Sequence, residues 1–173
     1  SKKAKKIYTR DCLTANDLTL QLKKKVSFLG NPFMDKFLFR YKELKKSDFS
    51  IGLFPGSRFP EIVDNFVLIL EVLEALSNLS YFQKVEFNFA IVNALSSSKI
   101  REIFKNRKWI FLEKITEKNL LKFQYKSLKV NLYWNSFDEI LLKSRCCISM
   151  AGTAAEQSIG LGKPVIQIEG KGP

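Results

Sequence analysis

Short apolar segments alternate with longer amphipathic ones along most of this chain, and this alternation limits the fold more than any other feature. Several of the short segments are apolar at every position rather than at every second one. Continuous apolarity is typical of strands that are covered on both faces, as in a parallel sheet. The predicted strands are residues 26–29, 50–54, 85–92, 109–112, 129–133, 146–150 and 164–168.

The segments between these strands carry helical periodicity. In residues 61–78, apolar side chains such as Ile62, Phe66 and Leu73 recur at helical spacing, and acidic side chains occupy the opposite face. Residues 97–104, 117–123, 136–143 and 153–161 are the other predicted helices. Strands that alternate with helices form βαβ units, so we expect an α/β fold with a doubly wound, mostly parallel sheet.

The organisation of the chain follows from its length and regularity. It has 173 residues, about one domain, and 46% of them are apolar, which is enough for a sizeable core. Residues 1–49 are less regular, and we interpret them as a linker and the edge of a preceding domain, with the sheet domain in residues 50–173. There is no initiator Met, and the chain stops just after a predicted strand, so we expect a truncated piece of a longer protein.

Several classes of protein are excluded by what the sequence lacks. The longest strictly apolar run, residues 66–70, is far below the roughly 20 residues of a membrane span, and no signal peptide is recognisable. Histidine is absent and there are three cysteines, so a four-ligand zinc site and a His-dependent catalytic triad are disfavoured. We predict no metal site, buried inert thiols at Cys146 and Cys147, and a reducing cytoplasmic location.

The positive charge of the chain lies mostly at its N-terminus. The net charge is +12, of which residues 1–46 carry +9. Lysine supplies 23 of the 29 cations, as in an AT-biased coding sequence, whereas nucleic-acid readers more often cluster Arg among aromatics. We expect no nucleic-acid partner. Peripheral contact with an anionic membrane through lysines 2–6 and 23–25 stays open, with a solvated lysine run as the alternative.

Two predicted strand–loop–helix junctions carry residues suited to ligand binding. The first runs from the strand at 50–54 into the helix at 61–78. Gly56 permits close backbone approach, Ser57 adds a hydroxyl, and Arg58 can grip a phosphate in a bidentate manner at a helix N-terminus. This pattern fits a phosphate or diphosphate; the alternative is an ordinary Pro-Gly turn with Arg58 in water.

The second junction joins the strand at 146–150 to the last predicted helix. Small residues around Gly152 allow a ligand or backbone to approach closely. Thr153 and Glu156 have the spacing of a capping box, in which each side chain satisfies a backbone N–H at the helix start. The functional interpretation is that Glu156 accepts hydrogen bonds from two sugar hydroxyls. Both interpretations stay open at this point.

At these junctions the sequence resembles the lipid-A-disaccharide synthase family. Residues 53–58 (Leu-Phe-Pro-Gly-Ser-Arg) with Glu61 resemble one family signature, and residues 151–156 (Ala-Gly-Thr-Ala-Ala-Glu) resemble another about a hundred residues later. Residues 30–32 resemble a Gly-His-Pro segment, with Asn31 in place of the His. Residues 8–15 and 160–165 look closer to the divergent, synthase-related branch. The resemblance covers residues 7–173.

The resemblance implies a two-domain GT-B glycosyltransferase, of which this chain is the C-terminal, Rossmann-like, donor-binding half. Such a hexosyltransferase moves an acylated glucosamine from UDP to a glycolipid acceptor, without a metal or cofactor and with inversion, at the cytoplasmic face of the inner membrane. The catalytic base is expected outside this chain, which would be inactive alone. The donor-binding residues implied are Gly56, Ser57, Arg58, Glu61, Phe137, Gly152, Thr153, Glu156 and Gln157, with uracil facing residues 134–137.

Three alternatives remain. A UDP-N-acetylglucosamine 2-epimerase shares the scaffold but would be expected to bring active-site histidines. The peptidoglycan N-acetylglucosamine transferase would show a more Gly-rich segment at residues 149–153. A non-catalytic basic binding module would use residues 1–46, and its binding would weaken steeply with salt.

Overall fold

The computed structural model describes residues 4–37 and 50–169, and the chain divides into two compact units, Ser1–Glu43 and Leu44–Pro173. The first unit holds a small parallel pair of strands, β1 (Ile7–Tyr8) and β2 (Val26–Ser27), connected through helix α1 (Cys12–Leu22). The sequence analysis did not predict α1. Its N-terminus is capped by Asp11, whose carboxylate accepts the backbone N–H of Thr14 at 2.7 Å. A 3-10 turn, η1 (Pro32–Phe37), follows β2.

The second unit is built on a seven-stranded sheet with the order β5-β6-β7-β4-β3-β8-β9. Every neighbouring pair from β7 to β9 is parallel, whereas β6 runs antiparallel to both β5 and β7. The expected α/β fold with a mostly parallel sheet is therefore confirmed, and it is compatible with a Rossmann-like fold. The strands are β3 (Ser50–Phe54), β4 (Glu86–Ile91), β5 (Ile110–Ile115), β6 (Leu120–Tyr125), β7 (Leu128–Trp134), β8 (Cys146–Ser149) and β9 (Val165–Gln167).

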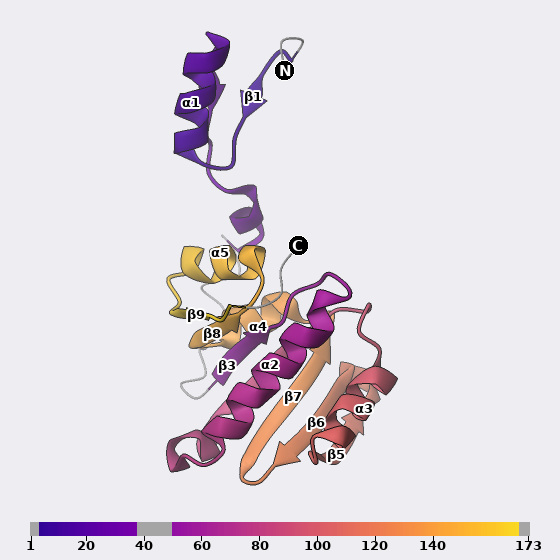
Figure 1. Cartoon of the computed structure of the whole chain (residues 1–173). Helices are drawn as coiled ribbons and strands as arrows, with labels where there is room; N and C mark the ends of the chain where they lie inside the picture. The colour runs from indigo at the N-terminus through magenta and orange to yellow at the C-terminus, as the bar shows by residue number, and fades with distance from the viewer. Residues whose placement is uncertain (1–3, 38–49, 170–173) are drawn as a thin grey trace. The chain divides into compact units, whose positions relative to one another are not determined.

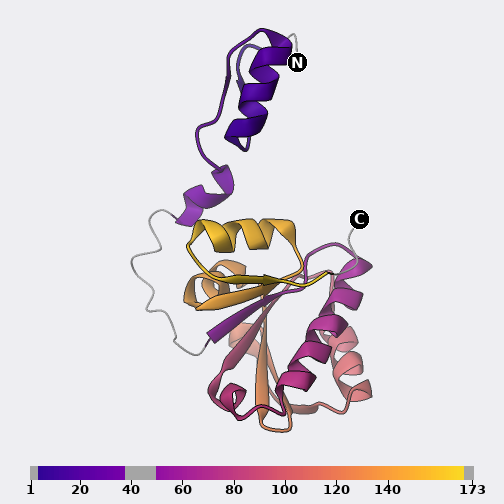
Figure 2. The same ribbon diagram turned by 60° about the vertical axis from the view of Figure 1, so that its left-hand side comes forward.

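Helices cover both faces of this sheet (Figures 1 and 2). Helices α2 (Glu61–Leu76) and α3 (Ser97–Asn106) lie on one face, and α4 (Phe137–Lys143) and α5 (Gly152–Gly160) lie on the other. The apolar stripe of α2 and the buried side of α3 form one core with alternate residues of the strands. Continuous apolarity did indicate two-sided burial in central strands such as β4, but not in β9, where Ile166 is 56% exposed. Two short 3-10 turns, η2 (Ser80–Lys84) and η3 (Thr116–Lys118), connect elements.

The helix predicted at residues 117–123 is wrong. The structure has η3 there, followed by strand β6, which pairs with β7 in a hairpin. Leu121 and Phe123 point into the core, and Lys122 between them does not, which is the two-residue period of a strand. Asn119 ends the turn in the left-handed region at φ 46° and so separates it from β6. The alternation of buried and less buried residues in β6 covers only residues 121–125, which is too short to distinguish a strand from a helix unless the pairing with β7 is known.

The C-terminal end of α4 is held close to the sheet by two features. The buried ammonium of Lys163 donates hydrogen bonds to the carbonyls of Leu142, at 2.9 Å, and Ser144. A cation at this end also opposes the negative pole of the helix. Gly52 in β3 allows the close approach, because a Cβ there would lie 2.8 Å from Ser144 Oγ. These contacts fix where α4 lies on the sheet.

Among the described residues, no helix is both long enough and apolar enough to cross a membrane.

Candidate functional site

The two junctions found in the sequence meet in space. Strands β3 and β8 are neighbours, with Phe54 opposite Ser149, and the Met150 N–H donates to the Phe54 carbonyl at 2.9 Å. The chain leaves β3 toward β4 on one side and later returns to β8 on the other side, so the strand order reverses between β3 and β8. Open α/β sheets bind ligands at such a switch point, beyond the carboxyl ends of the strands. The loops after β3 and β8 both lie there.

The first loop, residues 55–60, is shaped by a glycine and a buried amide. Gly56 has φ +106°, a conformation that residues with a Cβ rarely adopt. A Cβ at this position would lie 3.9 Å from the Ala151 side chain, so Gly56 faces the second loop. The Asn65 amide, from the first turns of α2, donates to the Pro55 carbonyl at 3.1 Å and holds the turn. Ser57 and Arg58 are exposed beside it.

The second loop is held by a buried hydroxyl. Ser149 Oγ donates to the Ala151 carbonyl at 2.9 Å and accepts the Ala151 N–H at 3.3 Å. These bonds keep Ala151 extended, at φ −118° and ψ 127°, as the residue before α5. Apart from the chain neighbours and the backbone of α5 itself, none of the described residues lies within 4 Å of the place a Cβ would take on Gly152. Space is therefore open in front of this helix end.

The predicted capping box at Thr153 and Glu156 is wrong. Helix α5 begins at Gly152 with Ala151 as N-cap, and no side chain caps it. Thr153 therefore lies inside the first turn, where it cannot act as the N-cap of that helix. Helix α2 likewise starts at Glu61 after Pro60 without a side-chain cap, whereas Ser96 caps α3. At the switch point, the first N–H groups of α5 have no backbone partner among the described residues and remain available for an anionic ligand. At α2, the Ile62 N–H already donates to the Arg58 carbonyl at 2.9 Å, and the Val63 N–H donates to the Pro60 carbonyl at 3.0 Å.

Three predicted side chains are partly or fully buried behind these loops. Glu156 is half-buried, with its Oε2 atom shielded from solvent, and Gln157 is buried. Glu61 Oε2 is also buried, and it has no hydrogen-bond partner within the described residues. An unsatisfied buried carboxylate oxygen is unfavourable, so Glu61 is suited to accept a hydrogen bond from a bound molecule.

The aromatic residues of the segment 134–137 separate onto two faces of the sheet. The Phe137 ring, at the start of α4, packs edge-on against the Phe54 ring with centroids 5.0 Å apart. Trp134 packs instead against the α2–α3 core, and its indole N–H donates to the Leu95 carbonyl at 3.3 Å. The structure thus brings Phe137, but not the Trp134 indole, to the end of β3.

The acidic and thiol side chains were also searched for reactive clusters. In the described parts of the chain, no cluster of three acidic, His or Cys side chains is placed to hold a metal. Cys146 and Cys147 are free thiols; Cys147 is buried as predicted, whereas Cys146 is only half-buried. Burial raises the pKa of both. A raised pKa keeps a thiol protonated and weakly nucleophilic.

One feature near the site was missed by the sequence analysis. A cavity opens at the same edge of the sheet, by β4, β6 and β7, and it collects side chains from five separate segments. No local sequence motif marks its lining residues Asn93, Ser97, Lys114 and Asn119. The sequence could have indicated only the turns at Asn119 and Asn135, because Asn tolerates the left-handed conformation that both residues adopt.

Two comparisons with known proteins were informative by their outcome. The sequence matches no protein-family model, and it matches none of the curated proteins searched. The functional argument therefore depends on the geometry of the two loops together with the motifs that they contain.

Proposed function

We propose that the switch-point site binds the nucleoside diphosphate of a UDP-sugar, and that the chain is the donor-binding half of a glycosyltransferase of the lipid-A-disaccharide synthase type. The observation that carries this proposal is the meeting of the two motif loops beyond the carboxyl ends of β3 and β8. These loops are far apart in the sequence, and a donor that spans both would explain why each contains its motif.

The first loop suits the diphosphate. Two helix N-termini without a side-chain cap, α2 and α5, point positive dipole ends at this edge of the sheet, and the first turn of α5 adds free N–H groups. Arg58 is exposed and makes no ion pair or hydrogen bond with the rest of the described chain through its side chain, so its guanidinium is available for phosphate. Ser57 adds a hydroxyl, and Gly56 leaves room for close backbone approach.

The second loop suits the nucleoside and the adjoining sugar. Gly152 and Thr153 are exposed at the start of α5, and the carboxylate of Glu156 lies one turn further in. We assign Glu156 to ribose hydroxyls, with Gln157 beneath it, and Glu61 to a hydroxyl or amide of the donor. Phe137 lines the side of the site on the α4 face.

In the proposed reaction, breaking the bond from the anomeric carbon leaves negative charge on UDP. Prearranged N–H groups and the Arg58 cation stabilise that charge, so no metal ion is required. We assign no catalytic base to this chain. The acceptor is a lipid-linked sugar, and the full protein acts at the cytoplasmic face of the inner membrane.

The test is calorimetric titration of the chain with UDP, ADP and inorganic phosphate at low and moderate salt. We expect UDP to bind selectively and the binding to survive moderate salt. Arg58→Ala should weaken UDP binding about tenfold or more, because a charged hydrogen bond is lost. Arg145→Ala is the matched control: Arg145 is exposed just before β8, at the opposite edge of the sheet. Binding that treats the three anions alike and disappears with salt would indicate a basic binding module instead.

A further inference from the structure

The cavity beside β7 is separate from the loops of the proposed donor site. It has a volume of about 250 Å³, below the range that holds a drug-sized ligand, so it has room for one small ring. Its polar lining comes from the ends of β4, β5 and β7, the start of α3 and the turn before β6. The polar lining residues are Asn93, Ser97, Lys114, Asn119, Trp134 and Asn135.

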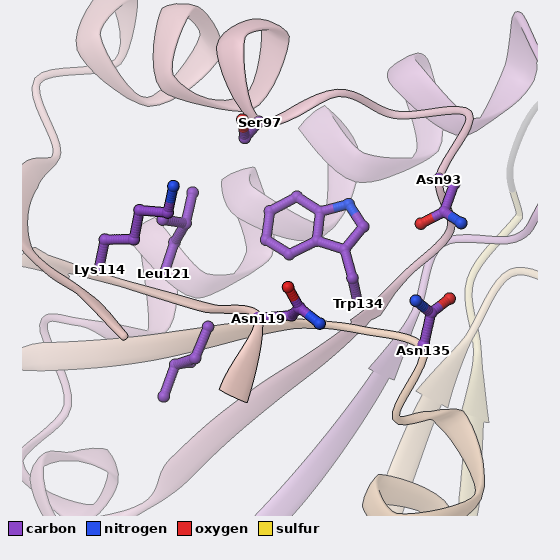
Figure 3. A pocket seen from close by; sticks show the side chains of 8 residues that line it. Asn93, Ser97, Lys114, Asn119, Leu121, Trp134 and Asn135 are labelled. Atoms are coloured by element: carbon purple, nitrogen blue, oxygen red, sulfur yellow. The ribbon is translucent and has the colours of Figure 1, made fainter. Parts of the chain in front are cut away.

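An indole in a defined orientation lies at the centre of this lining. Figure 3 shows the Trp134 ring between Asn93 and Asn135 on one side and Lys114 on the other, with Ser97 and Asn119 above and below. The hydrogen bond from Trp134 Nε1 to the Leu95 carbonyl, at 3.3 Å, fixes the ring. A fixed aromatic surface can pack against the apolar side of a ligand without losing side-chain entropy on binding.

The surrounding groups include both hydrogen-bond donors and acceptors. Each of the three amides supplies two N–H donors and one carbonyl acceptor. Among the described residues, the amides of Asn93, Asn119 and Asn135 make no hydrogen bond to the protein through their side chains. The left-handed backbone explains why Asn occupies positions 119 and 135, but it does not explain Asn93 or the hydroxyl of Ser97.

The site is poorly suited to a phosphate. Of the residues that the structure describes, those lining the cavity include one cation, Lys114, and no carboxylate. At the adjacent helix N-terminus, that of α3, Ser96 Oγ already accepts the Lys99 N–H at 3.2 Å, which removes one donor that a phosphate could use. This differs from α2 and α5, whose N-termini have no side-chain cap.

We propose that this cavity binds a single pyranose sugar ring. Sugar hydroxyls both donate and accept, which matches three amides, a hydroxyl and an ammonium, and the C–H face of the ring packs on the Trp134 indole. The side chains of Leu120 and Leu121 complete the apolar part of the lining. The proposal does not depend on UDP binding, because Trp134 lies on the α3 face of the sheet and the Phe137–Phe54 contact lies on the other face.

The experiment is a titration of the isotope-labelled chain followed by two-dimensional ¹H–¹⁵N NMR. The sequence has two tryptophans, so the indole region contains two signals. Trp134→Phe identifies its signal by removing it. Trp109 is buried and its indole N–H is bound to Glu74, so its signal is an internal reference. The probes are glucose, N-acetylglucosamine, uridine and inorganic phosphate.

We expect one or both sugars to shift the Trp134 indole signal in a saturable manner at millimolar concentration, and uridine and phosphate to leave it unchanged. Asn93→Ala and Asn119→Gly should each weaken the sugar about three- to tenfold, since each removes hydrogen bonds. Glycine is chosen at position 119 because it accepts the positive φ. The exposed amide of Asn106 lies outside the cavity, so Asn106→Ala is the matched control.

The proposal fails if neither sugar gives a saturable shift. It also fails if uridine or phosphate shifts the Trp134 signal as strongly as the sugars, or if Asn106→Ala weakens the sugar as much as Asn93→Ala. The backbone signals of the same spectra report whether each variant is folded. If Asn119→Gly does not fold, the test compares Asn93→Ala with the control Asn106→Ala alone. None of these results changes the expected outcome of the UDP titration.

Discussion

A carboxylate on α2 connects three elements, and removing it should destabilise the second unit. Glu74 Oε1 accepts the Arg107 Nε–H at 2.8 Å and the Trp109 indole N–H at 2.8 Å, and Oε2 accepts from Arg107 Nη2 at 2.7 Å. Arg107 ends α3 and Trp109 precedes β5, so the contact ties α2 to the next βα unit. Both charged side chains are about three-quarters or more buried.

We expect Glu74→Ala to lower the free energy of unfolding by about 3 kcal/mol. A hydrogen bond to a charged group contributes roughly 1.5–3 kcal/mol. In the variant, water can hydrate the partly exposed Arg107 guanidinium and so offset part of this loss. Trp109 is only 5% exposed, so its orphaned N–H adds a cost of roughly 1–3 kcal/mol. Glu74→Gln keeps one acceptor and should cost less, about 1–2 kcal/mol.

The pH dependence follows from the pKa of Glu74. Partial burial opposes ionisation, but the hydrogen bonds from Arg107 and Trp109 and the charge of Arg107 outweigh it and lower the pKa of the Glu74 carboxyl below 4.5. A carboxyl with a lowered folded pKa stabilises the fold above its unfolded pKa, and this stabilisation is lost as the pH falls through the folded value. The difference between wild type and Glu74→Gln should therefore close in that acidic window.

The assay is urea unfolding followed by circular dichroism at neutral pH and in acidic steps to about pH 2. Glu71→Ala is the control, because Glu71 makes a single 3.3 Å contact to Arg107 and its side chain is 52% exposed. Exposed pairs contribute about 0–1 kcal/mol. Equal losses for Glu71→Ala and Glu74→Ala would refute the reasoning, and so would a wild-type advantage over Glu74→Gln that persists in acid.

Three further predictions concern the elements that position the site. Gly52→Ala should lower stability by about 1–3 kcal/mol, because the new methyl group would lie 2.8 Å from Ser144 Oγ; an unchanged melting temperature would contradict this close packing. Lys163→Met should cost about 2 kcal/mol by leaving the last carbonyls of α4 without their donor, and urea titration measures this loss. Thr153→Ala should change stability by less than about 0.5 kcal/mol, since Thr153 is not the N-cap; a loss near 1 kcal/mol in thermal melts would show that it caps α5 after all.

Much of the second unit could be predicted from local sequence. The apolar spacing of α2 and the continuous apolarity of β3 placed both elements within two residues of their observed ends. These patterns are strong because each element buries a whole face against a large core. By contrast, residues 117–123 were wrongly predicted as a helix. Most of this segment belongs to strand β6, which is a strand because it pairs with β7.

The sequence predicted the residues of the candidate site but not their arrangement in space. The residues of each loop, such as Gly56 and Gly152, could be selected as a turn before a helix, because glycine and small residues have a local conformational meaning. Their proximity could not be inferred from spacing, and neither could the start of α5 at Gly152, which made the capping-box prediction wrong. The orphaned oxygen of Glu61 also exists only because of the packing around it.

The sequence by itself determined the alternation of strands and helices, the two-sided burial of the central strands and the two junctions that each place a glycine beside polar residues near a helix start. These properties are local, because hydrophobic periodicity and backbone freedom are set by neighbouring residues. Only the tertiary structure decided that β3 and β8 are adjacent, that Trp134 and Phe137 point to opposite faces, and that five segments enclose one cavity. Strand order and side-chain packing depend on contacts between residues far apart in the chain, and no local pattern encodes them.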